Sequence, residues 1–337
     1  MLFRSLFNGL TMDVILRTLF SSRATHQARD AAQATQVLSR CAMQEMFWPA
    51  SLPDWLPLPH QAVKRRAMAV LTGLVDGEIA ARRALPPGQA PTDDLLAMLL
   101  AVRDEDGSGL RPEELHDQCM VMFQAGHETS ATALLWWSWL MAGHPDAAQR
   151  AQDEVDRVLG GRAPQPADLA ALPWLGATLK EAMRLYPPVA ALMTRRVRRP
   201  FELRGRTVAA GTLLRITPWV IQRDERWFPD PEAFRPTRFL AEDPAQPRSA
   251  WLPFGVGPRV CIGQHFALLE MTLVAALLLQ RCTLHRVAGE APPRARMHVT
   301  LRPEGPLPLR LVRRAALTPQ SAPCASSVST PPASSNA

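Results

Sequence analysis

The chain has 337 residues, of which 47% are hydrophobic, and its 38 basic and 31 acidic side chains give a formal net charge of +7. This apolar content over this length can bury a large core, so the composition excludes a disordered protein. The basic residues are arginines scattered among acids, apart from Lys64 and Lys180. A nucleic-acid-binding protein would need a clustered basic face, whereas a basic docking patch for an acidic protein partner is compatible with this charge.

The cysteines are widely spaced along the chain: Cys41, Cys119, Cys261, Cys282 and Cys324. Without a CxxC pair they predict neither a zinc site nor a disulfide framework, which suits a reducing cytoplasm. No stretch of sequence reaches the ~18 uncharged apolar residues that a membrane span requires. We therefore expect a cytoplasmic protein with no membrane segment.

The first part of the chain has a helical pattern to about residue 83. Asp13 and Arg17 interrupt the apolar run near the start, which favours an amphipathic helix over a signal peptide. The apolar positions of this helix are Leu10, Val14, Ile15 and Leu19. The proline-rich stretch 48–60 predicts a turn between two helices, and Thr92 is expected to cap a short helix over 95–99.

Three further helices are predicted to begin at prolines, which suit the first helical turn. The first runs from Pro112 to about Met141 and is apolar nearly all round, so it should cross the interior of the protein. Others begin at Pro145 and Pro173, and the last of these must end before Pro187 because proline disfavours helix in the residue preceding it.

Short β-like runs replace the helical pattern between residues 200 and 216, and turns are predicted at Gly205 and Gly211. A long irregular stretch over 223–251 leads to a final helix over 263–280 and short strands near 297–301 and 307–312. The sequence thus predicts one mostly α domain with a minor β part over residues 1–314. The Ser/Pro/Ala-rich tail over 315–337 is expected to be disordered.

The strongest chemical signal is the run PFGVGPRVCIG over residues 253–263, which stands just before a helix. Its glycines allow a tight backbone turn, and a helix N-terminus favours a thiolate over a thiol. Cys261 is therefore a candidate metal ligand, with a buried structural cysteine as the alternative. Arg259 is placed to reach an anionic group of a cofactor, and Gly263 leaves room for a flat ring.

This run resembles the cysteine-ligand loop of the cytochrome P450 family, and it matches the pattern F-G-x-G-x-R-x-C-x-G without departure. The resemblance implies haem b as the cofactor, Cys261 as its axial iron ligand, and a cytochrome P450 fold. It also implies cofactor contacts from Phe254, Gly255, Arg259 and Gly263. Arg195 falls near a further propionate-binding arginine of the family, with Arg196 as the alternative.

A second motif, Ala125-Gly126-His127-Glu128-Thr129-Ser130, lies within the predicted interior helix. Buried acids and hydroxyls are costly unless satisfied or functional, and a threonine hydroxyl can bond a helix carbonyl instead. The resemblance implies an oxygen-binding groove at Ala125 and Gly126, with Glu128 and Thr129 delivering protons. A kinked helix with a back-bonded threonine is the alternative, whereas Ala131 excludes a zinc-protease H-E-x-x-H motif.

A third signal is the pair Glu181 and Arg184, whose i,i+3 spacing puts a carboxylate and a guanidinium on one helix face. Downstream, EAFRPTRF over 232–239 resembles the family's second arginine element. The resemblance implies that Arg238 joins Glu181 and Arg184 in a buried structural network, a task that suits bidentate arginine. Residues 189–192 and 303–306 fall where the family lines its substrate pocket.

The resemblance implies a monooxygenase that inserts one atom of O2 into a small apolar organic substrate. A separate ferredoxin or flavoprotein would supply electrons, because the sequence shows no flavin, iron–sulfur or dinucleotide motif. Two alternatives stand beside it: a peroxide-using or isomerising haem-thiolate enzyme, and a catalytically impaired haem-binding remnant. The second rests on the expectation that the family's N-terminal helices and β segments are missing from this chain.

Overall fold

The computed structural model describes residues 3–22, 25–46, 58–86, 88–89, 91–191, 194–241 and 246–315. Helices dominate these residues and the strands are short. The α-helices are α1 Phe3–Phe20, α2 Thr25–Met46, α3 Pro59–Ala84, α4 Leu95–Ala101, α5 Pro112–Gly143, α6 Pro145–Leu159, α7 Pro173–Leu185, α8 Pro218–Ile221 and α9 Gln264–Arg281. The 3₁₀ helices are η1 Pro166–Ala171, η2 Pro236–Phe239, η3 Arg248–Ala250 and η4 Gly257–Arg259. The prediction of a mostly α fold with a minor β part is confirmed.

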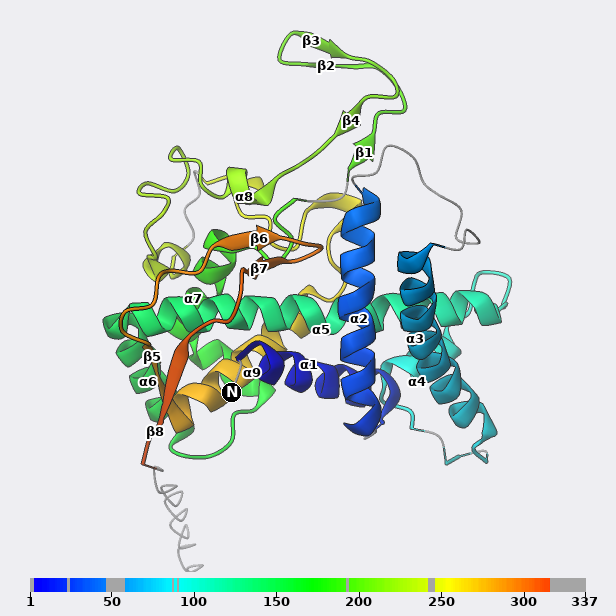
Figure 1. The fold of residues 1–337 in the computed structure, drawn as a ribbon, viewed down its shortest axis with the longest axis horizontal. Coiled ribbons are helices and arrows are strands. Elements are labelled where there is room, and N and C mark those ends of the chain that lie inside the picture. Colours follow the sequence, from blue (N-terminus) through cyan, green and yellow to red (C-terminus); the bar gives the residue numbers. More distant parts are fainter. Residues whose placement is uncertain are drawn as a thin grey trace, which may run out of the picture.

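The strands form four two-stranded antiparallel sheets. Their bounds are β1 Arg195–Arg196, β2 Phe201–Leu203, β3 Arg206–Val208, β4 Leu213–Leu214, β5 Cys282–Arg286, β6 Ala295–Met297, β7 Leu301–Pro303 and β8 Leu309–Arg313. The pairs are β1 with β4, β2 with β3, β5 with β8, and β6 with β7. Arg204 and Gly205, both with positive φ, make the tight turn of the β2–β3 hairpin, which projects from the helical body (Figure 1).

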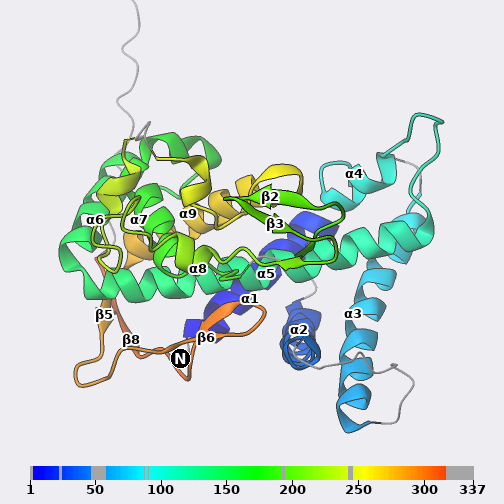
Figure 2. The same cartoon turned by 90° about the horizontal axis from the view of Figure 1, so that it is seen from above.

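Helix α5 runs through the length of the helical body and carries the core on both of its halves (Figures 1 and 2). One hydrophobic cluster packs its C-terminal half against α6, α7 and α9. A second cluster packs its N-terminal half against α1, α2, α3 and α4. Apart from Thr129, the helix is buried all round from His127 to Met141, but Val121 is 64% exposed, so the prediction is wrong for the N-terminal half.

The prolines mark helix starts as predicted, because Pro112, Pro145 and Pro173 each occupy the first helical turn. Helix α7 ends at Leu185, before the two prolines at 187 and 188. The final helix, α9, lies within one residue of its predicted bounds. These starts are local in origin, since proline has no backbone N–H to lose there and its fixed φ suits the helix.

Two local predictions in the first hundred residues are wrong. The helical pattern breaks after Phe20, where Ser21 has a φ of 55° and its N–H bonds the Arg17 carbonyl at 2.9 Å. Asp94 rather than Thr92 caps α4, because its carboxylate accepts the Ala97 N–H at 2.8 Å. Neither Gly nor Pro follows Phe20, so the hydrophobic periodicity alone did not indicate that α1 ends there.

The face of α1 that packs on α5 also differs from the prediction. Ile15 and Leu19 are buried as expected, but Leu10 is exposed. The buried stripe instead passes through Phe7 and Met12. The predicted turn over 48–60 falls largely outside the described residues, and so does the tail from residue 316 onward. Within the described ranges, no helix is both long enough and apolar enough to cross a membrane.

Candidate functional site

The loop that carries Cys261 is a tight backbone turn set against the start of α9. Gly255 and Gly257 have φ angles of 73° and 80°, which side chains other than glycine rarely adopt. The Cys261 N–H donates to the Phe254 carbonyl at 2.9 Å and closes the turn. Helix α9 begins three residues after the cysteine, at Gln264. The local sequence therefore delivers the thiol to a helix N-terminus.

The surroundings of Cys261 fit a haem group. Its side chain is an exposed free thiol, the donor that a thiolate-ligated iron requires. The apolar neighbours Val256, Val260 and Ile262 are exposed as well, with Ile262 at 89%. A side chain added to Gly263 would meet only the Cys261 sulfur, at 3.9 Å. Open space, a thiol and exposed apolar side chains together suit a flat apolar ring.

The arginines predicted to bind propionates lie on two separate exposed segments. Arg259 ends η4, two residues before Cys261. Arg195 and its alternative Arg196 form β1 and pair with Leu214 and Leu213 of β4. Haem contacts by these arginines, as by Phe254 and Gly255, stay predictions.

The Ala125–Thr129 turn of α5 shows the back-bonded threonine. The Thr129 hydroxyl donates to the Ala125 carbonyl at 2.9 Å, one turn earlier in the helix. Ala125 itself is exposed. The structure gives Gly126 a packing contact that the sequence did not suggest: a side chain there would lie 2.7 Å from the Ile15 methyl group of α1. Because Gly126 has no side chain, α1 can pack closely against α5 at this point, where a side chain would clash with Ile15.

Glu128 is buried and all of its hydrogen-bond partners come from other elements. Its Oε2 accepts the Ser39 hydroxyl of α2 at 2.8 Å. Its Oε1 accepts the Thr300 hydroxyl at 2.5 Å and a short ion-paired contact from Arg302 of β7. Arg302 also donates from Nε to the Thr300 hydroxyl at 2.9 Å. The carboxylate is therefore part of a joint between α5, α2 and β7.

These contacts decide the ionisation of Glu128. Burial by itself would raise the pKa of the carboxyl group, but the charge of Arg302 and the hydrogen bonds from Thr300, Arg302 and Ser39 outweigh it. The pKa of Glu128 consequently lies below its ordinary value, and the side chain is ionised at neutral pH. Before Glu128 can donate a proton it must itself be protonated, which its lowered pKa disfavours.

A second buried acid, Glu270 of α9, was missed by the sequence reasoning. Both of its carboxyl oxygens lack a hydrogen-bond partner among the described residues, and so does the buried Ser130 hydroxyl of α5. Burial raises the pKa of Glu270 to about 7, and nearby Ser130 offsets only part of this. The sequence contained a signal for it, because Glu270 is the one acid in α9, whose middle is largely apolar.

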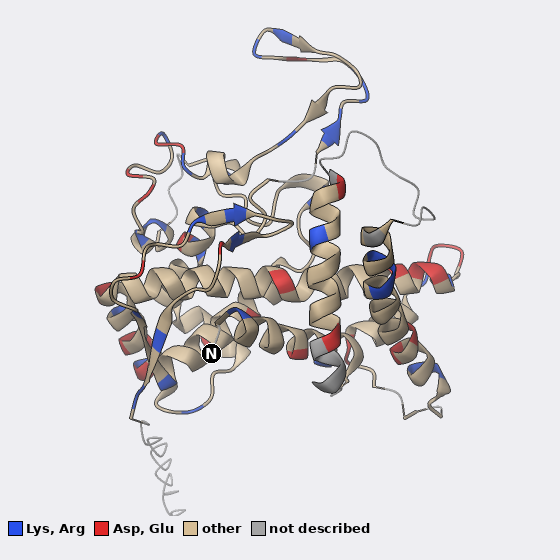
Figure 3. Ribbon diagram, in the orientation of Figure 1, with Lys and Arg blue, Asp and Glu red and all other residues tan. Residues whose placement is uncertain are grey.

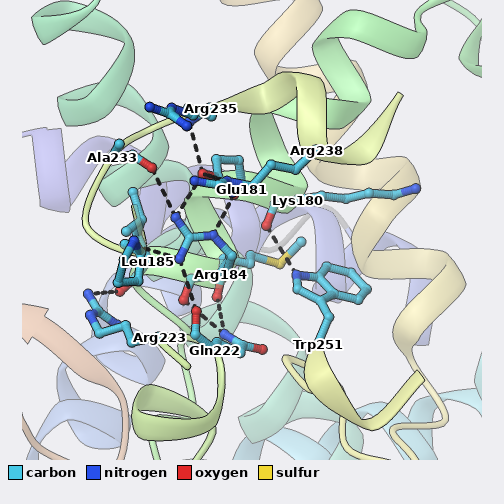
Figure 4. Close-up of polar contacts among 12 residues, drawn as sticks. Lys180, Glu181, Arg184, Leu185, Gln222, Arg223, Ala233, Arg235, Arg238 and Trp251 are labelled. Carbon is cyan, nitrogen blue, oxygen red and sulfur yellow. Dashed lines mark hydrogen bonds and ion pairs between the residues drawn. The ribbon is translucent and has the colours of Figure 1, made fainter. Parts of the chain in front are cut away.

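The structure brings Glu181, Arg184 and Arg238 together in one network (Figure 4). Arg184 and Glu181 are fully buried and share two hydrogen bonds, of 2.6 and 2.8 Å. Arg184 also donates to three backbone carbonyls, those of Gln222, Pro231 and Ala233. The Nε of Arg238 lies 3.4 Å from Glu181 Oε1. These contacts connect α7 to the irregular segment 222–238. The structural role of the three residues stays a prediction.

Sequence comparison gives this architecture a family. Residues 3–309 match the family model described as cytochrome P450. Cyclooctatin synthase of Streptomyces melanosporofaciens is 37% identical over 298 residues, 88% of this chain and 64% of that protein. Pentalenene oxygenase of Streptomyces avermitilis is 35% identical over 275 residues, 81% of this chain and 60% of that protein. The chain belongs to the cytochrome P450 family.

Solved structures agree with this assignment. The heme domain of cytochrome P450DA superposes with a TM-score of 0.83 at 26% identity, covering 94% of this chain and 69% of that one. A retinoic acid-bound cyanobacterial protein, CYP120A1, superposes with a TM-score of 0.81 at 29% identity, covering 92% and 69%. The chain spans between 60% and 64% of the length of the two curated Streptomyces relatives above.

Proposed function

We propose that this chain carries the thiolate-ligand site of a haem-dependent monooxygenase that inserts one oxygen atom from O2 into an apolar organic substrate. The observation that carries the proposal is the exposed Cys261 thiol in a glycine turn at the start of α9. Haem b, when bound, would supply the iron that activates oxygen, and an axial thiolate donates electron density to it.

Different residues of the chain would bind the haem and transfer protons. Cys261 would hold the iron, while Gly263 and the exposed apolar side chains of its loop would lie against the ring. Thr129, on the turn that starts at Ala125, offers a hydroxyl on a partly exposed side chain. Glu128 holds a negative charge one residue away and would accept and pass on protons.

The substrate class is proposed from the relatives. Their names include a cyclooctat-9-en-7-ol 5-monooxygenase, 36% identical over 84% of this chain, and a pentalenene oxygenase. Both point to small, largely hydrocarbon molecules. We further propose a ferredoxin or flavoprotein as a separate electron donor and a cytoplasmic location, since the cysteines are spaced too widely for redox or disulfide motifs.

A reduced carbon-monoxide difference spectrum of the haem-supplied chain tests thiolate ligation. We expect a long-wavelength Soret band in the wild-type protein that is lost in Cys261→Ala. Cys282→Ala is the matched control, because Cys282 is a free, partly exposed thiol at the other end of α9. A band that persists in Cys261→Ala, or that disappears in Cys282→Ala alone, would refute the assignment of the ligand.

A further inference from the structure

The contacts of Glu128 extend over three parts of the molecule that are distant in sequence. Ser39 is 89 residues away and Arg302 is 174 residues away, yet both reach the same carboxylate. Because both oxygens are occupied, the side chain has one orientation available while these contacts hold. That orientation directs it toward α2 and the β6–β7 hairpin, whereas the Thr129 hydroxyl bonds within α5.

The charges facing Glu128 come from every element packed around it. Arg302 is the ion-pair partner, and Arg4 of α1 interacts electrostatically with both Glu128 and Arg302, whereas Arg40 of α2 acts on Arg4. Two histidines complete this set of groups, His127 on α5 and His298 between β6 and β7. Burial lowers the pKa of both histidines, which keeps them neutral. Glu128 thus interacts with two guanidinium groups, those of Arg302 and Arg4.

A small cavity of about 10 Å³ reaches the same group, with Arg4, Asn8, Gln36, Glu128 and Arg302 among its lining residues. A cavity of roughly this size accommodates one water molecule when polar groups line it. Water at this position would connect Glu128 to polar side chains of α1 and α2. A water molecule there would give the carboxylate a partner for proton exchange on the side held by Arg302.

We propose that Arg302 is the positioning residue for Glu128, holding it ionised and turned toward the water-sized cavity, and so determining when it can deliver a proton. The proposal rests on the monooxygenase function proposed above, for which it adds a residue of β7. Thr300 and Ser39 assist, because each donates a hydrogen bond to one oxygen of the same carboxylate.

Infrared titration of the Glu128 carboxyl group tests the proposal without bound haem. The band is assigned by its loss in Glu128→Gln. In Arg302→Met the protonation midpoint should rise by at least about one pH unit, because an opposite charge at this range lowers a carboxyl pKa by ~1–3 units. Arg302→Lys keeps the charge and should shift the midpoint less. Arg296→Met is the control, since Arg296 lies on the same hairpin in an exposed pair with Glu304.

Arg302→Gln guards against a misfolded Arg302→Met protein, because its amide can still donate hydrogen bonds and only the charge is lost. It should also shift the midpoint upward. A folded Arg302→Met protein, or Arg302→Gln if the former does not fold, that titrates like the wild type would overturn the proposal.

In the haem-loaded protein, Arg302→Met should move the acid limb of the pH–rate profile upward and divert oxygen consumption away from product. The carbon-monoxide spectrum of the wild type reports separately on ligation by Cys261. A normal spectrum with an unchanged pH profile in Arg302→Met would reject the positioning role alone. A missing spectrum with a shifted infrared titration would reject the proposed function and leave the electrostatic control of Glu128 intact.

Discussion

At the scale of single residues, Glu270 shows how strongly the interior acts on a carboxyl group. The side chain is 5% exposed, and among the described residues no cation is close enough to affect its pKa. Burial disfavours the charged form, so the pKa of Glu270 rises from its ordinary value of 4.5 to about 7. The folded protein therefore keeps this proton over a range of pH in which the unfolded chain loses it.

The free energy of unfolding should consequently fall as pH rises from about 4.5 through 7 and level off above. Glu270→Gln keeps the shape of the side chain and removes the titration. Between pH 4.5 and 8, the free energy of unfolding of Glu270→Gln should rise relative to that of the wild type by on the order of 3 kcal/mol, at about 1.4 kcal/mol per pKa unit. Urea unfolding at several pH values measures this.

Glu290→Gln, at an exposed position in the loop after β5, is the control for a lost negative charge. Parallel pH dependences for Glu270→Gln and wild type would show that the buried carboxyl does not retain its proton.

At the scale of elements, Arg184 fastens the irregular segment 222–238 to α7. Each of its five N–H groups has an acceptor: two oxygens of Glu181 and three backbone carbonyls. A segment without regular secondary structure needs such partners, because its buried carbonyls have no neighbouring strand or helix to bond them. The side chain of Arg184 therefore supplies this segment with the hydrogen bonds that a neighbouring strand would supply in a sheet.

Arg184→Lys should destabilise the protein by roughly 2–4 kcal/mol, because an ammonium has three donors and leaves buried acceptors unpaired. Chemical unfolding measures the loss, and limited proteolysis should show cleavage within 222–238 appearing first. Arg226→Lys makes the same change in an exposed pair with Asp224 and should cost no more than about 0.5 kcal/mol. Equal effects of the two substitutions would contradict the fastening role of Arg184.

At the scale of the whole molecule, α5 joins two hydrophobic clusters, and the Cys261 loop lies beside the one that contains α9. Positions of Lys and Arg are spread over many elements of the ribbon and alternate with positions of Asp and Glu (Figure 3). The exposed Val256, Val260 and Ile262 stand out as apolar surface at the candidate site. Apolar surface of this kind commonly marks a place where something binds.

We therefore expect haem binding to increase the free energy of unfolding of the whole protein. At a haem concentration about 100-fold above the dissociation constant, binding adds ~2.7 kcal/mol to the free energy of unfolding. The melting temperature should rise, and fluorescence of a dye that binds apolar surface should fall. Cys261→Ala should show a smaller rise, whereas Cys282→Ala should match wild type. Equal gains in wild type and Cys261→Ala would mean that the thiol contributes nothing to haem affinity.

The sequence by itself determined the features whose causes are local. Prolines 112, 145 and 173 start helices because their fixed φ and missing N–H suit a first turn. Gly255 and Gly257 turn the chain before Cys261 because glycine adopts positive φ without steric cost. The family resemblance followed from the same short run, since its residues are consecutive and need no partner to be recognised.

Only the tertiary structure decided which side chains meet. The end of α1 at Ser21, the partners of Glu128 and the isolation of Glu270 all depend on segments brought together by packing. Arg302 and Thr300 follow Glu128 by more than 170 residues, so no spacing rule connects them. The charge state of a buried group depends on such neighbours and on the water excluded around it, and both exist only once the chain has folded.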